Sequence, residues 1–441
     1  MIPENNESEP LTAAVRRRWW HLATVDTTPL RRHRDFRLLF IGRFVSFFGS
    51  MVSSVAFPFQ VYQETHSVLL VGALGVLEFG AILGFAFLGG ALADASDRRA
   101  MVLWTEAALM ACSLVLAANA LLATPQIWLL FAVATAWGVL DAIQRPSLDA
   151  MLPRLVDKGE LAAAAALGSL RGTLGMILGP ALGGVLLAVF GLPVTYMFDV
   201  ATFVVGLACL WLMRAVPPPL DAERPSLRRV VEGLRYAASR QELIGTYAVD
   251  MVAMFFGMPF ALFPAIAQGL GGPSVLGLLY AAPAVGSFVF SATSGWTNRV
   301  TRHGMGVIVA ATVWGLAIVG FGLAPGLPLA LFFLALAGAA DMMSGVFRSV
   351  IWNQTIPDSL RGRLAGIEMI SYTSGPALGN FEAGIVASLF NVRVSVVSGG
   401  VLCVIGCVVA AIVLPAFRAY DAKVYHAAPD PASGIVKREK Q

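Results

Sequence analysis

The string GPALG occurs twice in this chain, at Gly179–Gly183 and again at Gly375–Gly379. Each copy lies within a long apolar run that otherwise favours a helix. Small residues at four-residue spacing let two helix backbones touch, and a proline bends a helix because it removes one backbone hydrogen-bond donor. The repeat therefore indicates a helical membrane protein that contains an internal duplication.

The composition points to lipid as the solvent for most of the chain. Of the 441 residues, 57% are hydrophobic and 13% are charged, whereas a soluble domain is about half apolar and about a quarter charged. In lipid, only α-helices and closed barrels satisfy their backbone polar groups. Because the apolar runs are continuous and do not alternate with polar residues, we expect an all-α membrane protein.

Twelve apolar runs are long enough to span a bilayer, which takes about 20 helical residues. A polar stretch with three consecutive prolines and several arginines divides them into two groups of six. We therefore expect twelve transmembrane helices in two six-helix halves. The expected segments are a tail (1–37), an N-terminal half (38–213), a linker (214–242), a C-terminal half (243–416) and a second tail (417–441).

The basic residues orient these helices. If the N-terminus lies in the cytosol, the outer loops are nearly free of Lys and Arg, whereas the inner loops, the linker and both tails are basic. Membrane proteins carry this excess on their cytosolic side, so we expect both termini in the cytosol. The membrane surface accounts for the formal charge of +4, and nothing calls for nucleic acid as a partner.

The two halves carry similar residues at matching places. Span 2 ends in GGALADASDRR (residues 89–99), and span 8 ends in SGWTNRVTRHG (residues 294–304). Spans 4 and 10 each carry an aspartate followed by an arginine, and spans 5 and 11 carry the two GPALG strings. Internal repeats of this kind are one known plan of transporters.

Two of these stretches resemble signatures of the major facilitator superfamily. GGALADASDRR resembles its loop between spans 2 and 3, and GMILGPALGG (residues 175–184) resembles the span-5 motif of its exporters. Residues 141–184 are similar to the branch that holds the bacterial enterobactin exporters, and the likeness extends over nearly all of residues 30–416. The resemblance implies a transporter of a bacterial inner membrane that functions as a monomer.

The resemblance also implies a gating role for the loop between spans 2 and 3. Asp94 would hold the inward side shut by meeting the start of span 11, because a helix N-terminus favours a carboxylate. Gly90, Arg98 and Arg99 belong to the same loop, and the two arginines would brace it or meet lipid phosphates.

The loop departs from the family pattern at Ala95 and Asp97. The span-4 arginine signature of many drug–proton antiporters has no clear match either, because Arg145 lies near the cytosolic end. These departures leave the mode of proton coupling open.

Two rows of small residues and prolines are expected at helix contacts. Static packing and a moving interface both explain such rows. The first row is Gly175, Gly179, Pro180, Gly183 and Gly184, and the second is Gly375, Pro376 and Gly379.

Charged side chains inside membrane spans are costly and are by default functional. Asp141 and Arg145 lie four residues apart on one helix face, so they can form an ion pair. Asp341 and Arg348, seven residues apart, also share a face. Burial favours the neutral form of a carboxyl that has no partner. The candidate proton or substrate sites are Glu78, Asp141, Arg145, Arg171, Asp250, Asp341 and Arg348.

Other charged residues in the spans have simpler expected roles. Arg43 in span 1 and Arg171 in span 5 are candidate counter-charges or anchors for an anionic substrate, unless Arg43 snorkels to the surface. Four acids nearer the span ends are expected to reach interfacial water: Glu106, Asp199, Glu368 and Glu382.

Aromatic residues in spans 1 and 7 are candidate cavity lining, because these spans are equivalent in the repeat and line the central cavity in the resembled family. Contact with lipid or neighbouring helices is the alternative for each of them. The candidates are Phe44, Phe47, Phe48, Phe255 and Phe256.

The sequence therefore predicts a secondary active transporter. It would export a small amphipathic molecule, either siderophore-like or a drug, in exchange for protons by alternating access. There is no phosphate-binding P-loop, zinc-protease helix or nucleophile elbow, so we expect no enzyme, cofactor or metal site. A proton-coupled importer and a membrane sensor or scaffold that does not transport are the alternatives.

Overall fold

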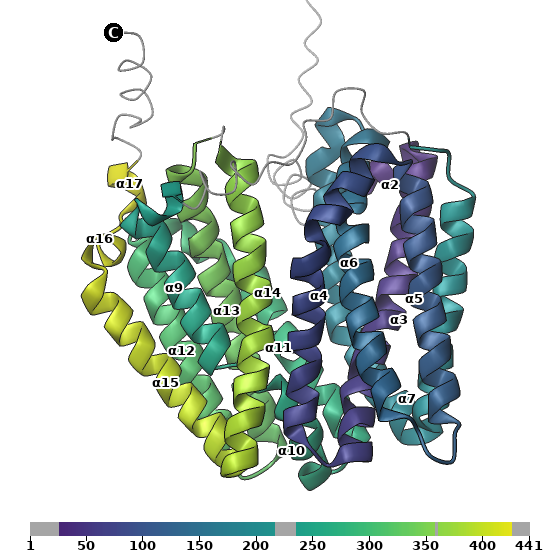
Figure 1. Cartoon of the computed structure of the whole chain (residues 1–441). Helices are drawn as coiled ribbons and strands as arrows, with labels where there is room; N and C mark the ends of the chain where they lie inside the picture. The colour runs from purple at the N-terminus through teal and green to yellow at the C-terminus, as the bar shows by residue number, and fades with distance from the viewer. Residues whose placement is uncertain (1–25, 217–234, 358–359, 426–441) are drawn as a thin grey trace, which may run out of the picture.

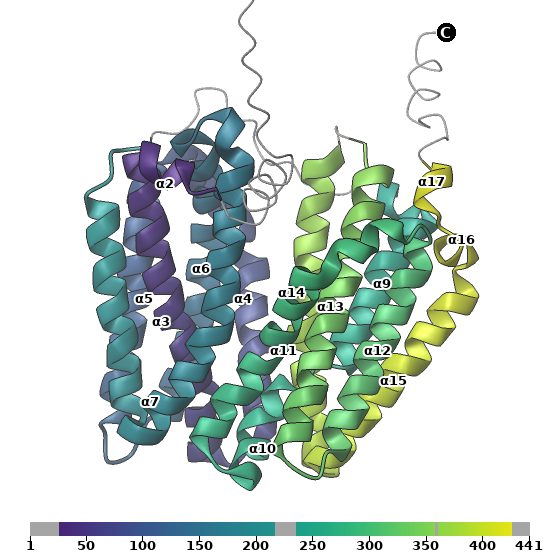
Figure 2. The same ribbon diagram turned by 180° about the vertical axis from the view of Figure 1, so that it is seen from behind.

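The computed structural model describes residues 26–216, 235–357 and 360–425. These residues form helices joined by short loops, and no strand occurs among them. Ten of their helical stretches are long and apolar enough to cross a membrane. The helices run side by side in two bundles, one from each part of the chain (Figures 1 and 2).

The first bundle contains α3 (Arg34–Thr65), α4 (Val68–Ala95), α5 (Arg98–Ala120), α6 (Ile127–Leu155) and α7 (Leu161–Trp211). The second contains α9 (Gln241–Phe256), α10 (Phe263–Leu270), α11 (Pro273–Thr293), α12 (His303–Leu323), α13 (Leu327–Thr355), α14 (Arg361–Leu389) and α15 (Val392–Val413). Short helices at the bundle edges are α2 (Thr28–Arg32), α16 (Pro415–Arg418) and α17 (Ala422–Tyr425), with 3-10 turns η1 (Lys158–Glu160), η2 (Phe260–Leu262) and η3 (Ser294–Arg299).

Both ends of the described chain lie at one end of the bundles. This linker end carries α2 and α17, and the opposite or far end carries α10 (Figure 1). Polar residues fix the turns between helices. At the far end, His66 adopts a left-handed conformation after α3, and the Leu70 N–H donates to Ser67 Oγ at the start of α4.

The helix α7 covers two of the expected spans. Its backbone is non-helical at Gly191 (φ 78°, ψ −178°), a conformation that favours glycine. Arg99 at the linker end donates to the main-chain oxygens of Leu210 and Trp211, and Arg32 at the same end pairs with Glu160. Since both ends of α7 lie at the linker end, the chain reverses near Gly191.

Span 7 is also interrupted. Helix α9 ends at Phe256, and the chain continues through the η2 turn into α10. The Gly257 carbonyl at this break accepts a hydrogen bond from Trp314 Nε1 of α12 at 3.1 Å. The break leaves the η2 backbone close to α4 and α14, where the two bundles meet.

The glycine row of α7 packs against α3, inside the first bundle. A Cβ on Gly183 would lie 2.7 Å from the main-chain oxygen of Val52, and one on Gly175 would lie 2.5 Å from the Phe47 ring. The row of α14 packs in the same way against α9, since a Cβ on Gly379 would lie 2.6 Å from the Phe255 main-chain oxygen. The repeated motif thus sets equivalent helix contacts in both bundles.

Two further glycines bring the bundles into contact with each other. A Cβ on Gly184 of α7 would lie 2.8 Å from the Cα of Gly277 in α11, and one on Gly72 of α4 would lie 2.5 Å from the Asn380 main-chain oxygen in α14. Both contacts lie toward the far end. Three turns from Gly72 on the same face of α4, Leu83 is 49% exposed, and α4 and α14 diverge toward the linker end (Figure 1).

Candidate functional site

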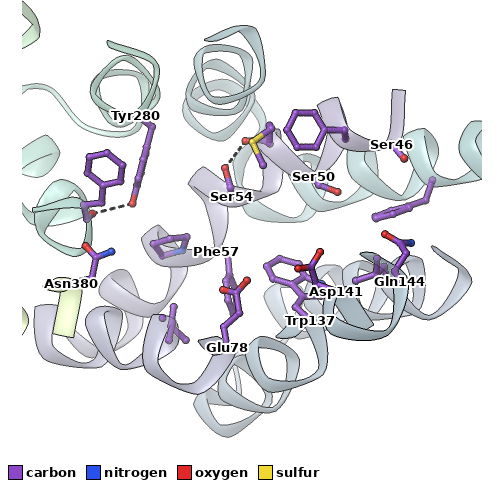
Figure 3. Close-up of a pocket in the computed structure, with 18 of the residues that line it drawn as sticks. Ser46, Ser50, Ser54, Phe57, Glu78, Trp137, Asp141, Gln144, Tyr280 and Asn380 are labelled. Atoms are coloured by element: carbon purple, nitrogen blue, oxygen red, sulfur yellow. Dashed lines mark hydrogen bonds between the residues drawn. The ribbon is translucent and has the colours of Figure 1, made fainter. Parts of the chain in front are cut away.

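A cavity of about 520 Å³ lies in the middle of the first bundle. All five of its long helices contribute to the wall, and the second bundle contributes Phe260, Ala261, Tyr280 and Asn380 (Figure 3). Tyr280 Oη donates to the Phe260 main-chain oxygen at 3.1 Å, and the Ala261 N–H donates to Asn380 Oδ1 at 2.8 Å. These bonds join η2, α11 and α14 into one side of the cavity.

The wall of the cavity is amphipathic. Helix α3 presents a serine ladder, which consists of the hydroxyls of Ser46, Ser50 and Ser54 at four-residue spacing (Figure 3). Aromatic rings form another part of the wall, where Phe57 of α3 meets Trp137 of α6 edge to face with ring centroids 4.9 Å apart. Such a surface suits a ligand that has both aromatic faces and polar edges.

Two carboxylates from different helices reach into this cavity. Glu78 of α4 and Asp141 of α6 both line it (Figure 3). Asp141 lies 4.0 Å from Arg145 one turn along its own helix, and both side chains are about two-fifths exposed (44% and 40%). Glu78 makes no hydrogen bond or ion pair with a side chain of the described residues, so its carboxyl is available to a ligand.

A buried polar network closes the cavity on its linker-end side. Arg43 of α3 forms an ion pair with Glu106 of α5 and donates to Gln144 Oε1 at 3.2 Å. Gln144 Nε2 donates in turn to Glu106 Oε1 at 3.2 Å and to Thr105 Oγ1 at 3.1 Å. The expectation that Glu106 reaches interfacial water is wrong: it is 1% exposed, because it lies two turns into α5 and faces α3.

Asp199 corrects a second expectation. It was also expected near water, but it is completely buried (0% exposed). Asp199 Oδ2 accepts hydrogen bonds from Ser53 of α3 at 3.0 Å and from Ser113 of α5 at 2.8 Å. It lies about two turns beyond the reversal at Gly191 and faces the interior of the first bundle.

The second bundle brings three of the predicted residues together. Arg348 of α13 forms an ion pair with Asp250 of α9 and lies 3.9 Å from Asp341, which is about two turns earlier on the same face of α13. Trp352 lies beside this group, with its ring centroid 5.9 Å from the Arg348 guanidinium. The group borders a second cavity of about 380 Å³, which Glu368 also lines. Spacing within one helix predicted the Asp341–Arg348 pair, but it carried no information on Asp250.

Arg171 of α7 lies in the first bundle, near the Arg43–Glu106 pair. It is partly buried, and its Nε has no hydrogen-bond partner in the described part of the chain. It does not line the 520 Å³ cavity.

The predicted gating loop is only partly described. Gly90 and Asp94 belong to α4, but the side chain of Asp94 lies outside the described residues, as do most side chains around residues 364–366. Arg98 is buried and donates to the Ala150 main-chain oxygen at 3.1 Å. Arg99 donates to main-chain oxygens at the end of α7 at 2.7 and 2.6 Å, where a cation is favoured.

One of the five candidate phenylalanines lines the 520 Å³ cavity, and the other four lie elsewhere. Phe47 lines the cavity and also contacts Gly175. Phe44 stacks on Phe40, Phe48 meets Phe198 edge to face, and Phe255 meets Phe256. Those four are absent from the lining of the 520 Å³ cavity. The serine ladder of α3, which the sequence analysis did not single out, contributes more of its wall.

One group outside the spans has metal-ligand chemistry. His33, Asp157 and Glu160 at the linker end have ligand atoms within 4.8 Å of one another. Glu160 is already engaged, since it lies 2.8 Å from His33 Nε2 and 3.1 Å from Arg32 Nη1. The positive charge of Arg32 disfavours a metal cation there, and these contacts hold α2 against η1.

Comparison with known proteins agrees with this architecture. A family model described as "Transmembrane secretion effector" matches residues 24–440. The chain belongs to this family. The family likeness to the major facilitator superfamily is confirmed, and members of the transmembrane secretion effector family are membrane transporters and not enzymes.

Two curated relatives have the same name. Enterobactin exporter EntS of Citrobacter koseri is 30% identical over 380 residues, which cover 86% of this chain and 91% of that protein. EntS of Shigella boydii has the same identity and coverage.

Solved structures of low identity share the fold. A POT family transporter in complex with 5-aminolevulinic acid has a TM-score of 0.69 at 11% identity, covering 87% of this chain and 97% of that one. A bacterial homologue of the lysosomal transporter Spinster, inward-facing and unoccupied, has a TM-score of 0.65 at 16% identity, covering 92% and 100%.

Proposed function

We propose that the protein exports a small amphipathic, siderophore-like molecule across a bacterial inner membrane in exchange for protons. The observation that carries the proposal is the 520 Å³ cavity, which combines aromatic faces, a serine ladder and two carboxylates at mid-bundle depth. Relatives named as enterobactin exporters, aligned over 86% of the chain, support the substrate class. The substrate would bind in this cavity, and the protein would work as a monomer.

The chain would cross the membrane twelve times. Helix α7 supplies two crossings on either side of Gly191, α9 and α10 together supply one, and the remaining long helices supply one each. This gives six crossings on each side of the segment 214–242, in agreement with the two halves of the sequence. Residues 1–37 and 417–441 would then be tails on one side of the membrane.

The linker end would face the cytosol. Arginines and lysines gather there, at the ends of α2, α5, α6, α12 and α16, whereas Arg393 lies at the far end. An excess of basic residues marks the cytosolic side of membrane proteins. Because the bundles touch through Gly184–Gly277 and Gly72–Asn380 toward the far end, the described state would be inward-facing.

Export by alternating access would then follow from the geometry. The substrate would enter from the cytosol, and η2, α11 and α14 would separate from the first bundle to release it outside. Glu78 and Asp141 would hold polar edges of the substrate, and protons would compete for the same carboxylates. Asp94 would help to hold the inward side shut in the outward-facing state.

The test compares the spent medium of a deletion strain and a complemented strain, grown with and without iron, by untargeted mass spectrometry. We expect an iron-chelating metabolite to be lost from the medium and to accumulate inside the deletion strain. A complementing allele with Glu78→Gln should fail to restore export while reaching the membrane normally. An unchanged metabolite profile would remove the siderophore-like substrate from the proposal and favour a drug.

A further inference from the structure

The first bundle contains a buried carboxyl that the export cycle described above does not use. Asp199 lies where α3, α5 and α7 meet, and its side chain has no exposed surface. The absence of a side chain at Gly49 makes room for it, because a Cβ there would lie 2.7 Å from Asp199 Oδ1. The site is therefore shaped around this carboxyl.

No cation neutralises Asp199 among the residues that the structure describes. The other deeply buried acids differ in this respect, since Glu106 pairs with Arg43 and Asp250 pairs with Arg348. An ionised carboxylate in an apolar interior is costly without a partner. The surroundings of Asp199 thus favour its neutral, protonated form.

Asp199 also has hydrogen bonds that would stabilise the anion once the proton leaves, because accepted hydrogen bonds favour the charged form of a carboxyl. Oδ2 accepts from Ser53 at 3.0 Å and from Ser113 at 2.8 Å. Thr202 Oγ1 donates to the main-chain oxygen of Asp199 at 2.7 Å, which leaves its lone pairs free to accept. The contact between Oδ1 and the same Thr202 oxygen is the longest of these, at 3.5 Å, so Oδ1 is the less engaged oxygen and can carry the proton.

We propose that Asp199 is a proton-binding site of the exchange, separate from the carboxylates in the cavity. The inference rests on the proposed proton exchange. Ser53 connects Asp199 to the cavity wall, because it donates to the carboxyl. Ser54, the next residue, and Ser50, one turn away, line the cavity. Loss of the proton would place a negative charge behind this part of α3 and so favour a different packing of α3 on α7.

The ionisable groups near Asp199 are consistent with this role. Glu106 of α5 opposes a negative charge at Asp199, and Arg43 of α3 is held by Glu106. Tyr196 lies one turn before Asp199 on α7 and donates from its hydroxyl to Gln60 Oε1 at 2.7 Å. None of these groups supplies a free positive charge that would fix Asp199 as an anion.

The first test needs no substrate. The full-length protein in lipid nanodiscs is titrated with alkali while the infrared carbonyl stretch of protonated carboxyls is recorded. We expect a solvent-shielded carboxyl band that Asp199→Asn removes and Ser113→Ala displaces, because the latter deletes one hydrogen bond to Oδ2. Asp250→Asn serves as the matched control and should leave this band in place. An identical band in wild type and Asp199→Asn would overturn the proposal.

Transport measurements separate this inference from the proposed function. Asp199→Asn keeps the size and hydrogen bonds of the acid, so enterobactin counterflow should persist while accumulation driven by a pH gradient is lost. If the infrared band belongs to Asp199 but wild type moves no enterobactin, the proposed substrate fails and the proton site stands. If gradient-driven accumulation survives in Asp199→Asn, the site has no part in the exchange.

Discussion

Asp199 in the first bundle and Asp250 in the second have contrasting surroundings. Asp250 is paired with Arg348, which also lies 3.9 Å from Asp341. Asp199 has hydroxyl donors from Ser53 and Ser113 and no cation beside it in the described part of the chain. Both acids are buried, so burial alone does not set their behaviour. The presence or absence of an arginine decides whether a buried acid serves as half of a fixed ion pair or can hold a proton.

The packing of the two bundles is much more alike than their charges. Gly183 meets α3 and Gly379 meets α9 through equivalent glycine rows, and each bundle touches the other through a glycine of its second long helix, Gly72 or Gly277. The duplicated sequence has therefore kept its helix contacts, while its buried charges have diverged. The following experiments test that contrast, beginning with the largest expected effect.

Removing the cation of the second bundle should have the largest effect on stability. Arg348→Ala leaves Asp250 buried without its partner, which costs about 3–5 kcal/mol. Thermal unfolding of the purified protein measures the loss. The double variant Arg348→Gln with Asp250→Asn should recover much of it, because no uncompensated charge remains. If the single variant is as stable as wild type, the ion pair does not organise the second bundle.

Filling a glycine contact should affect both bundles alike. Gly183→Ala and Gly379→Ala each force a Cβ against a main-chain oxygen, 2.7 and 2.6 Å away, and overpacking of this kind costs about 1–3 kcal/mol. Gly168→Ala is the control, because its Cβ would meet no atom within 4 Å. Unequal losses at the two motif positions would show that the packing of the bundles has diverged as well.

Neutralising the cavity acid should reduce transport and leave stability unchanged. Glu78→Gln removes a charged acceptor that has no protein partner among the described residues, and a hydrogen bond to a charged group contributes about 1.5–3 kcal/mol. We therefore expect enterobactin efflux from loaded proteoliposomes to fall by about tenfold or more. Glu382→Gln, outside the cavity, is the matched variant and should transport normally. Equal efflux rates for the two variants would show that Glu78 takes no part in substrate binding.

Asp199→Asn should affect stability less than the matching change at Asp250. The amide replaces a neutral carboxyl of nearly the same shape, so the change in unfolding free energy at neutral pH should stay within about 1 kcal/mol. Asp250→Asn, which leaves Arg348 with the more distant Asp341, should cost more. A large loss in Asp199→Asn and a small one in Asp250→Asn would reverse the contrast between the bundles.

Much of the fold could be predicted from the sequence, because lipid demands long apolar helices and the repeat is visible in the GPALG strings. The continuity of α7 through Gly191 could not be predicted, since hydropathy shows where a chain turns and not the backbone conformation at the turn. The break after α9 was hidden for the same reason, because its residues are as apolar as a helix interior.

Glu78 and Asp141 could be singled out because each charge lies within an apolar run, and both line the 520 Å³ cavity. A role for them in transport stays a prediction. Glu106 and Asp199 were misjudged because distance from a span end gives depth but not the helix face, and it is the face that buries both. The pairing of Asp250 with Arg348 joins helices far apart in the chain, and no spacing rule reports such a contact. The serines of α3 gave no signal because hydroxyls are common in membrane helices.

The central claim is that outward movement of a siderophore-like molecule is coupled to inward movement of protons. The most direct measurement uses everted membrane vesicles, metal-free enterobactin and an imposed pH gradient, acidic inside. The account expects accumulation in wild-type vesicles that a protonophore abolishes, and no accumulation above the protonophore level in Asp199→Asn vesicles. Accumulation that is unaffected by the protonophore would contradict proton exchange altogether.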